Sequence, residues 1–151
     1  MVLNSIDADV YVADMETYEI IFMNEHMIEN FSADYVGEIC WKVFRNDGAP
    51  CSHCTNDKLL DSNGKPTGVI EWECQNPITK KWYTNFDRAI QWKDDRYFRL
   101  QVATNITERK KAEQSLRETN DLLEVRVQER TAQLAKSRDL AEAASLILNP
   151  S

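Results

Sequence analysis

The distribution of aromatic residues along the chain constrains its fold more than any single motif. All fourteen aromatic residues, all four cysteines and all four glycines precede residue 105. Residues 106–148 contain neither glycine nor proline and are rich in residue types that favour helices. The first part can therefore form an aromatic core, whereas the second must bury its apolar side chains elsewhere. We expect a domain over 1–105, a helix over 106–148 and a short tail over 149–151.

Strand-forming segments in the first part are separated by turn-forming ones. Two of them flank the polar turn 14–17 and predict a hairpin. A mixed stretch with glycine and proline breakers follows, and three further strand candidates come after it. This order predicts an α+β fold, in which a five-stranded antiparallel sheet carries short helices on one face. The expected strands are 10–13, 19–23, 69–74, 82–90 and 97–102.

The expected helix carries an apolar stripe with a seven-residue repeat. Asn105 can cap its start, with Glu108 three positions on. Isolated helices are marginal in water, so we interpret the stripe as the seam of a parallel two-stranded coiled coil, which implies a homodimer. Polar residues at three seam positions lower stability while fixing register; a solvated single helix is the alternative. The apolar seam residues are Leu116, Leu123, Val127, Leu134, Ala141, Ala144 and Leu148.

Charge and hydropathy exclude several classes of protein. The net charge of -7 disfavours nucleic-acid binding, which needs basic surface. No apolar run is long enough to cross a membrane. The N-terminus lacks the basic start and apolar core of a signal peptide. We therefore expect a cytoplasmic protein with mostly reduced cysteines.

Residues 105–113 resemble the boundary between a PAS domain and its signalling helix. They read Asn-Ile-Thr-Glu-Arg-Lys-Lys-Ala-Glu, and they follow the strand order of that family. Asn24 after the second strand and the segment 36–41 also look like PAS landmarks, so the resemblance covers roughly residues 3–113. Asn105 departs from the acidic residue usual at that position. The resemblance implies a sensory domain that feeds a signalling helix.

The helix resembles the connector of bacterial sensor histidine kinases at residues 127–134 and 140–145. This implies a two-component system, with a kinase or another effector as the output. Neither His26 nor His53 has the sequence context of the phosphorylated histidine, and no glycine-rich ATP-binding region is present. No nucleophile–base pair is visible either, so we expect no enzymatic activity in this chain.

The cysteines suggest a second function, a small redox or metal-binding protein. Cys51 and Cys54 form a C-x-x-C motif around His53, and Cys40 and Cys74 could complete a tetrahedral zinc site. The close pair could instead be redox-active. Since only one pair is close in sequence, we favour plain structural thiols.

Flavin and haem are not favoured as cofactors. Light-sensing PAS relatives place a reactive cysteine after Gly-x-x, as Gly37 and Cys40 do here. Those relatives surround it with polar residues that grip the flavin, whereas this chain has Ile39, Trp41 and Lys42. Haem needs an axial ligand, usually histidine, and both histidines are expected at the surface.

PAS relatives often enclose a small ligand between the sheet and the helices, which implies a small, mainly apolar molecule of unknown identity. Asn85 and Arg99 could add polar anchors, and core packing is the alternative reading of the aromatic set. The candidate pocket residues are Trp41, Phe44, Trp72, Trp82, Phe86, Arg88 and Phe98.

Overall fold

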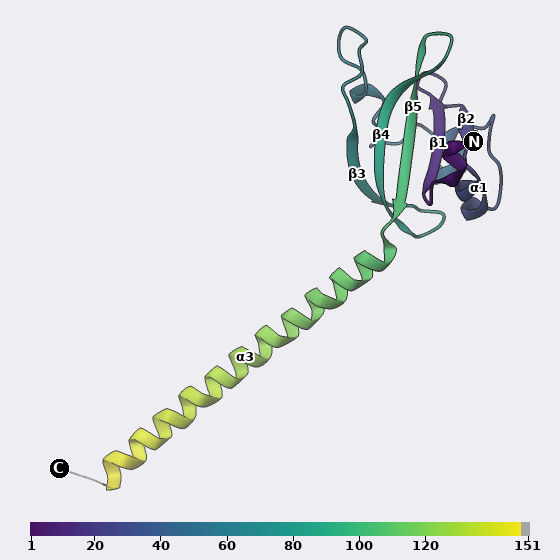
Figure 1. Cartoon of the computed structure of the whole chain (residues 1–151). Coiled ribbons are helices and arrows are strands. Elements are labelled where there is room, and N and C mark those ends of the chain that lie inside the picture. The colour runs from purple at the N-terminus through teal and green to yellow at the C-terminus, as the bar shows by residue number, and fades with distance from the viewer. Residues whose placement is uncertain (149–151) are drawn as a thin grey trace. The chain divides into compact units, whose positions relative to one another are not determined.

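The computed structural model describes residues 1–148, which form two compact units, Met1–Thr107 and a second unit from Glu108 onward. The expected tail 149–151 lies outside the described residues. The first unit holds the sheet and the short helices, and the second is helical (Figure 1).

A five-stranded antiparallel sheet forms the first unit, with the strands in the order β2-β1-β5-β4-β3. The α+β fold predicted from the strand pattern is therefore confirmed. The strands are β1 (Asp9–Asp14), β2 (Ile20–Met23), β3 (Ile70–Gln75), β4 (Trp82–Lys93) and β5 (Arg96–Asn105).

The β4–β5 hairpin is longer than the sequence pattern predicted. Its tight turn consists of Asp94 and Asp95, both with a φ of 54°. Aspartate tolerates this left-handed conformation, which matches the twist of the paired strands. The strands therefore extend toward the turn beyond the segments 82–90 and 97–102.

Short helices connect the first and second halves of the sheet. They are α1 (Glu25–Phe31) and α2 (Cys40–Arg45), with a 3-10 turn at Asn56–Lys58; a further 3-10 turn, Val2–Ser5, precedes β1. Asn24 caps α1, because its side chain accepts a hydrogen bond from the Met27 N–H. A cluster of buried residues joins β1, β2 and both helices: Tyr11, Ala13, Ile20, Met23, Met27, Cys40 and Phe44.

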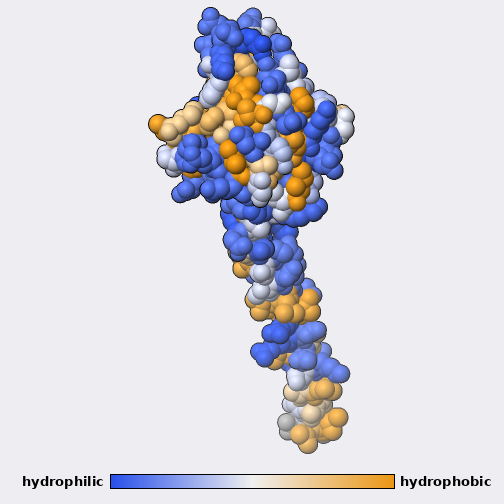
Figure 2. Space-filling view, turned by 90° about the vertical axis from the view of Figure 1, so that its right-hand side faces the viewer, coloured by the Kyte–Doolittle hydropathy of each residue, from blue (hydrophilic) through white to orange (hydrophobic). Residues whose placement is uncertain are grey.

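Helix α3 runs from Thr107, the last residue of the first unit, to Leu148 and makes up the described part of the second unit; none of its 42 residues is buried. Figure 2 shows hydrophobic patches at intervals along it, separated by charged and polar surface. No helix within residues 1–148 is long and apolar enough to span a bilayer.

Candidate functional site

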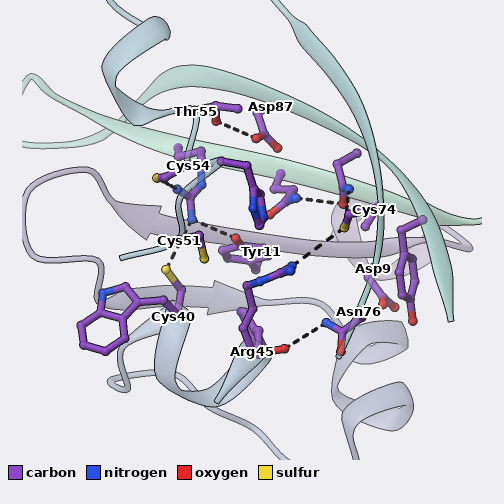
Figure 3. A pocket seen from close by; sticks show the side chains of 18 of the residues that line it. Asp9, Tyr11, Cys40, Arg45, Cys51, Cys54, Thr55, Cys74, Asn76 and Asp87 are labelled. Atoms are coloured by element: carbon purple, nitrogen blue, oxygen red, sulfur yellow. Dashed lines mark hydrogen bonds between the residues drawn. The ribbon is translucent and has the colours of Figure 1, made fainter. Parts of the chain in front are cut away.

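A cavity of about 80 Å³ lies inside the first unit. It exceeds several-fold the roughly 10–15 Å³ that a single water needs by this kind of measure. Helices α1 and α2 and the segment 51–55 line one side of the cavity, and strands β1, β3, β4 and β5 line the other (Figure 3). All four cysteines belong to this lining, although they come from three separate regions of the chain.

Polar side chains from the neighbouring strands β4 and β5 form much of the sheet side of the cavity. Asn85 and Asp87 on β4 and Arg99 and Gln101 on β5 are all buried. Gln101 donates to the Asn85 oxygen at 2.9 Å. Buried polar groups are costly unless they are paired, so four of them on one sheet face mark a site rather than ordinary core packing.

Arg99 links the sheet to the cysteine segments. Its guanidinium donates to the sulfurs of Cys54 at 3.3 Å and Cys40 at 3.4 Å, to the Tyr11 hydroxyl at 2.9 Å and to the Asn56 side chain at 2.7 Å. Arg99 is only 5% exposed, and its Nε has no hydrogen-bonding partner among the described residues. None of its partners carries a formal negative charge unless a thiol ionises.

Asp87 is the buried carboxyl of the cavity that comes closest to acting as a counter-ion for Arg99. Its Oδ2 accepts from the Thr55 hydroxyl at 2.7 Å and from the Trp72 indole at 2.8 Å, whereas its Oδ1 has no partner among the described residues. Burial raises the pKa of Asp87 above its ordinary value, and the hydrogen bond from Thr55 and the charge of Arg99 offset only part of this rise.

The four cysteines are free thiols in different environments. Cys40 is buried, and burial raises its pKa. Burial also raises the pKa of Cys51, to about 11. Cys74 accepts from the Asn85 side chain at 3.4 Å. No group of three or more histidine, cysteine or acidic side chains within residues 1–148 is placed to hold a metal ion.

The rim of the cavity reaches the surface beside His53. This histidine is an exposed residue, yet it lines the cavity and its ring lies 4.8 Å from that of Trp72. Partial burial lowers the pKa of His53 below its ordinary value, and the nearby charge of Arg45 acts in the same direction. His26, in contrast, lies outside the cavity and bonds to Asp9 at 2.9 Å.

The candidate pocket residues from the sequence divide into two groups. Trp41, Phe44 and Trp72 line the cavity. The other four candidates do not, and their placement corrects the sequence interpretation: Trp82, Phe86, Arg88 and Phe98. Side chains alternate along a strand, and Tyr83, Asn85, Asp87, Arg99 and Gln101 take the cavity side, so these four point to the opposite face.

Asp87, Thr55 and Tyr11 were missed as site residues by sequence reasoning. Asp87 and Thr55 have the character of surface residues, and Tyr11 that of a core aromatic. The one available signal was the alternation of β4, where Asp87 shares a face with Asn85.

Comparison with solved structures supports the fold, although no protein-family model and no curated protein matches the chain. Among solved structures, the PAS domain of nitrogen regulation protein NR(II) from Vibrio parahaemolyticus is similar over 70% of this chain and 94% of its own, with a TM-score of 0.55 and 14% identity.

Two further structures are similar. An RNA-binding light-oxygen-voltage receptor matches 78% of this chain and 35% of its own, with a TM-score of 0.56 and 12% identity. The PAS domain of an HTR-like protein from Haloarcula marismortui matches 68% of this chain and 84% of its own, with a TM-score of 0.50 and 13% identity. The sheet order, the helices over one face and these similarities agree: the chain has the fold of a PAS domain.

Proposed function

We propose that the chain is a signal-sensing and dimerisation module of a cytoplasmic, sensor histidine kinase-like protein. The cavity in the first unit, Met1–Thr107, called the PAS unit from here on, receives the stimulus. Helix α3 pairs with α3 of a second copy, and the pair passes the signal to a kinase or another output domain. Catalysis belongs to that output and not to this chain. Four free thiols suit a reducing compartment.

One observation carries this proposal: the strand that lines the cavity continues almost directly into the helix. Arg99 and Gln101 of β5 line the cavity, β5 ends at Asn105, and α3 begins at Thr107. The single residue between them, Ile106, is buried, and its N–H donates to the Trp82 carbonyl at 2.8 Å. A change in the pairing of β5 therefore has a short route to the start of the helix.

The helix itself supports dimerisation. Leu116, Leu123, Val127 and Leu134 of the predicted seam are 49–71% exposed in the single chain. Exposed leucine and valine at a seven-residue spacing gain free energy when a second helix covers them. Salt bridges such as Arg109–Glu113 and Arg138–Glu142 lie along the same helix and add only a few tenths of a kcal/mol each.

Sedimentation equilibrium at tens of micromolar tests the proposal. We expect a dimer for the unchanged chain and a monomer for Leu123→Glu, which places a charge on the seam. Val125→Glu is the matched control, because Val125 is equally exposed but two residues off the seam; it should remain dimeric. A monomer for the unchanged chain, or equal loss in both variants, contradicts the proposal.

The second candidate, a redox protein using Cys51 and Cys54, is favoured by the position of both thiols on one cavity. Oxidation to a disulfide would release two protons and pass two electrons to an oxidant such as diamide. The raised pKa of Cys51, about 11, weakens this reading, because the thiolate is the reactive form.

Thiol counting before and after diamide treatment separates the two candidates. Under the redox reading the chain loses two titratable thiols, and the double variant Cys51→Ser, Cys54→Ser loses none. Under the sensor reading, the double variant dimerises like the unchanged chain and diamide removes few thiols. Native mass spectrometry of the same samples reports any retained metal.

A further inference from the structure

The cavity contains a buried cation, Arg99, which the charge of Asp87 influences but which no carboxylate contacts at salt-bridge distance among the described residues. Arg99 forms no salt bridge among the described residues, although Asp14, Asp9 and Asp47 each pair with another basic residue. Arginine does not lose its proton in proteins, so the charge remains inside. A buried charge without a counter-ion is strongly unfavourable, and neutral partners such as Tyr11 and the thiols offset only part of that cost.

The unmet hydrogen bonds of the cavity are mainly donors. Within residues 1–148, the buried side-chain nitrogen and oxygen atoms without a partner are Trp41 Nε1, Arg99 Nε and Asp87 Oδ1. All three residues line the same cavity. The first two atoms can only donate. The third atom, Oδ1 of Asp87, belongs to a carboxyl group whose Oδ2 already accepts two hydrogen bonds.

The other charged groups facing the cavity do not supply the missing acceptor. The Asp9 carboxylate already forms hydrogen bonds with His26 at 2.9 Å and with Asn30 at 2.7 Å. Arg45 adds a second positive charge at the rim, 3.7 Å from Asp47. An occupant that completes the site must therefore bring acceptor oxygens and negative charge.

The part of the lining that α1 and α2 contribute is largely apolar. Met27, Phe31 and Phe44 belong to it, with the rings of Phe31 and Phe44 5.1 Å apart. A small hydrocarbon or aromatic body fits this part of the lining better than a fully hydrated inorganic ion does.

We propose that the cavity is a binding site for a small organic carboxylate, whose oxygens accept from Arg99 Nε and Trp41 Nε1 and whose apolar body packs on α1 and α2. The inference rests on the proposed function, since this ligand would be the stimulus that the module senses. The carboxylate neutralises Arg99, and Arg99 lies on the strand that leads into α3.

Thermal melting with matched ligand pairs tests the site. The probes are acetate, pyruvate and benzoate, the neutral amides acetamide and benzamide, and inorganic phosphate. We expect at least one carboxylate to raise the melting temperature in a saturable way, while the amides and phosphate leave it unchanged. No response to any carboxylate, or an equal response to the amides or to phosphate, overturns the proposal.

Two variants locate the binding. Arg99→Gln should weaken carboxylate binding at least tenfold, because a hydrogen bond to a charged group is lost. Arg88→Gln is the matched control on the opposite face of the neighbouring strand β4, and it should bind as the unchanged chain does. Unchanged affinity in Arg99→Gln contradicts the assignment.

A third variant keeps the site testable if Arg99→Gln fails to fold. Trp41→Phe keeps the ring but removes the N–H, and it should weaken binding several-fold. Unchanged binding in Trp41→Phe would then count against the site. The outcome is separate from that of the dimer test: a dimer that binds no carboxylate overturns only this inference, and a monomer that binds one overturns only the dimerisation.

Discussion

Single buried polar residues hold the PAS unit together at points where the chain changes direction. Asn24 is completely buried between β2 and α1. Its oxygen accepts from the N–H groups of Val10 at 3.0 Å and Met27 at 3.1 Å, and its nitrogen donates to the Ala8 carbonyl at 2.9 Å. The Asn24 side chain thus caps α1 and also hydrogen-bonds to the backbone on both sides of Asp9, the first residue of β1.

Replacing Asn24 with alanine should be strongly destabilising. The change leaves buried backbone groups without partners and removes the α1 cap, so we expect the free energy of unfolding to fall by about 2–4 kcal/mol. Urea unfolding followed by tryptophan fluorescence measures it. Asn63→Ala, in an exposed turn, is the control and should change stability by less than about 0.5 kcal/mol. Equal effects of the two changes would contradict this role.

Asp87 gives the stability a pH dependence of known sign. Burial raises its pKa above the ordinary 3.8. The folded state therefore holds this proton more tightly than the unfolded state does, and the carboxyl's contribution to stability is lost as the pH rises from about 3.8 through the raised folded pKa. In Asp87→Asn this loss is absent.

The free energy of unfolding of Asp87→Asn, minus that of the unchanged chain, should consequently increase between pH 4 and pH 7. Urea titrations at a series of pH values give this difference. Asp95→Asn, an exposed carboxyl in the β4–β5 turn, corrects for the general effect of removing a charge. A difference that stays flat or decreases would show that burial does not raise the pKa of Asp87.

At the scale of elements, the strands and hairpins were predictable, but the cavity face of the sheet was not. Hairpins follow from short-range patterns, and all five expected strands exist. On β4, however, one face carries Trp82 and Phe86, whereas the other carries Tyr83 together with the polar Asp87. Hydrophobicity favours the first face, yet Phe86 is 37% exposed and Asp87 is 1% exposed.

The reason lies in contacts between distant segments. Asp87 is buried with hydrogen bonds from Trp72 and from Thr55, which lies 32 positions earlier. Arg99 likewise needs Cys54, Cys40 and Tyr11 around it. Local pattern contains no information on such partners, and an isolated Asp or Arg on a strand has the ordinary character of a solvent-facing residue.

The junction between β5 and α3 is a defined element, and Thr107 is its key side chain. Its hydroxyl accepts from the Trp82 N–H at 3.0 Å and donates to the Asn105 side chain at 2.6 Å. The Asn105 oxygen also accepts from the Thr107 N–H at 3.0 Å, two positions on, which is the bond of an Asx turn before the helix. The start of α3 is thereby tied to the first residue of β4.

Replacing Thr107 with valine keeps the shape of the side chain but removes both hydroxyl bonds. We expect the free energy of unfolding of the PAS unit to fall by about 1 kcal/mol. Thr119→Val is the matched control, because Thr119 is exposed on the same helix and its hydroxyl donates to the Ser115 carbonyl within that helix. Comparable losses in both variants would remove the special role of the junction.

At the scale of the whole molecule, the two units differ in what stabilises them. The PAS unit has a core of its own, whereas α3 has no buried residue in the single chain. A helix without tertiary packing is marginal in water, even when its residues favour helix formation. The stability of α3 should therefore depend on a second chain, and that of the PAS unit should depend on it much less.

Melting at different protein concentrations tests this difference directly. Circular dichroism at 222 nm follows mainly α3, and near-ultraviolet signals follow the aromatic residues, all of which lie in the PAS unit. Because association stabilises by mass action, dilution from tens of micromolar to below one micromolar should lower the melting temperature of the far-ultraviolet signal by several degrees. The near-ultraviolet transition should move less.

In Leu123→Glu the far-ultraviolet signal should already be reduced at high concentration and should not respond to dilution, whereas Val125→Glu should behave as the unchanged chain does. A far-ultraviolet transition independent of concentration in the unchanged chain would mean that α3 is stable without a partner, and the seam would then have no role in pairing.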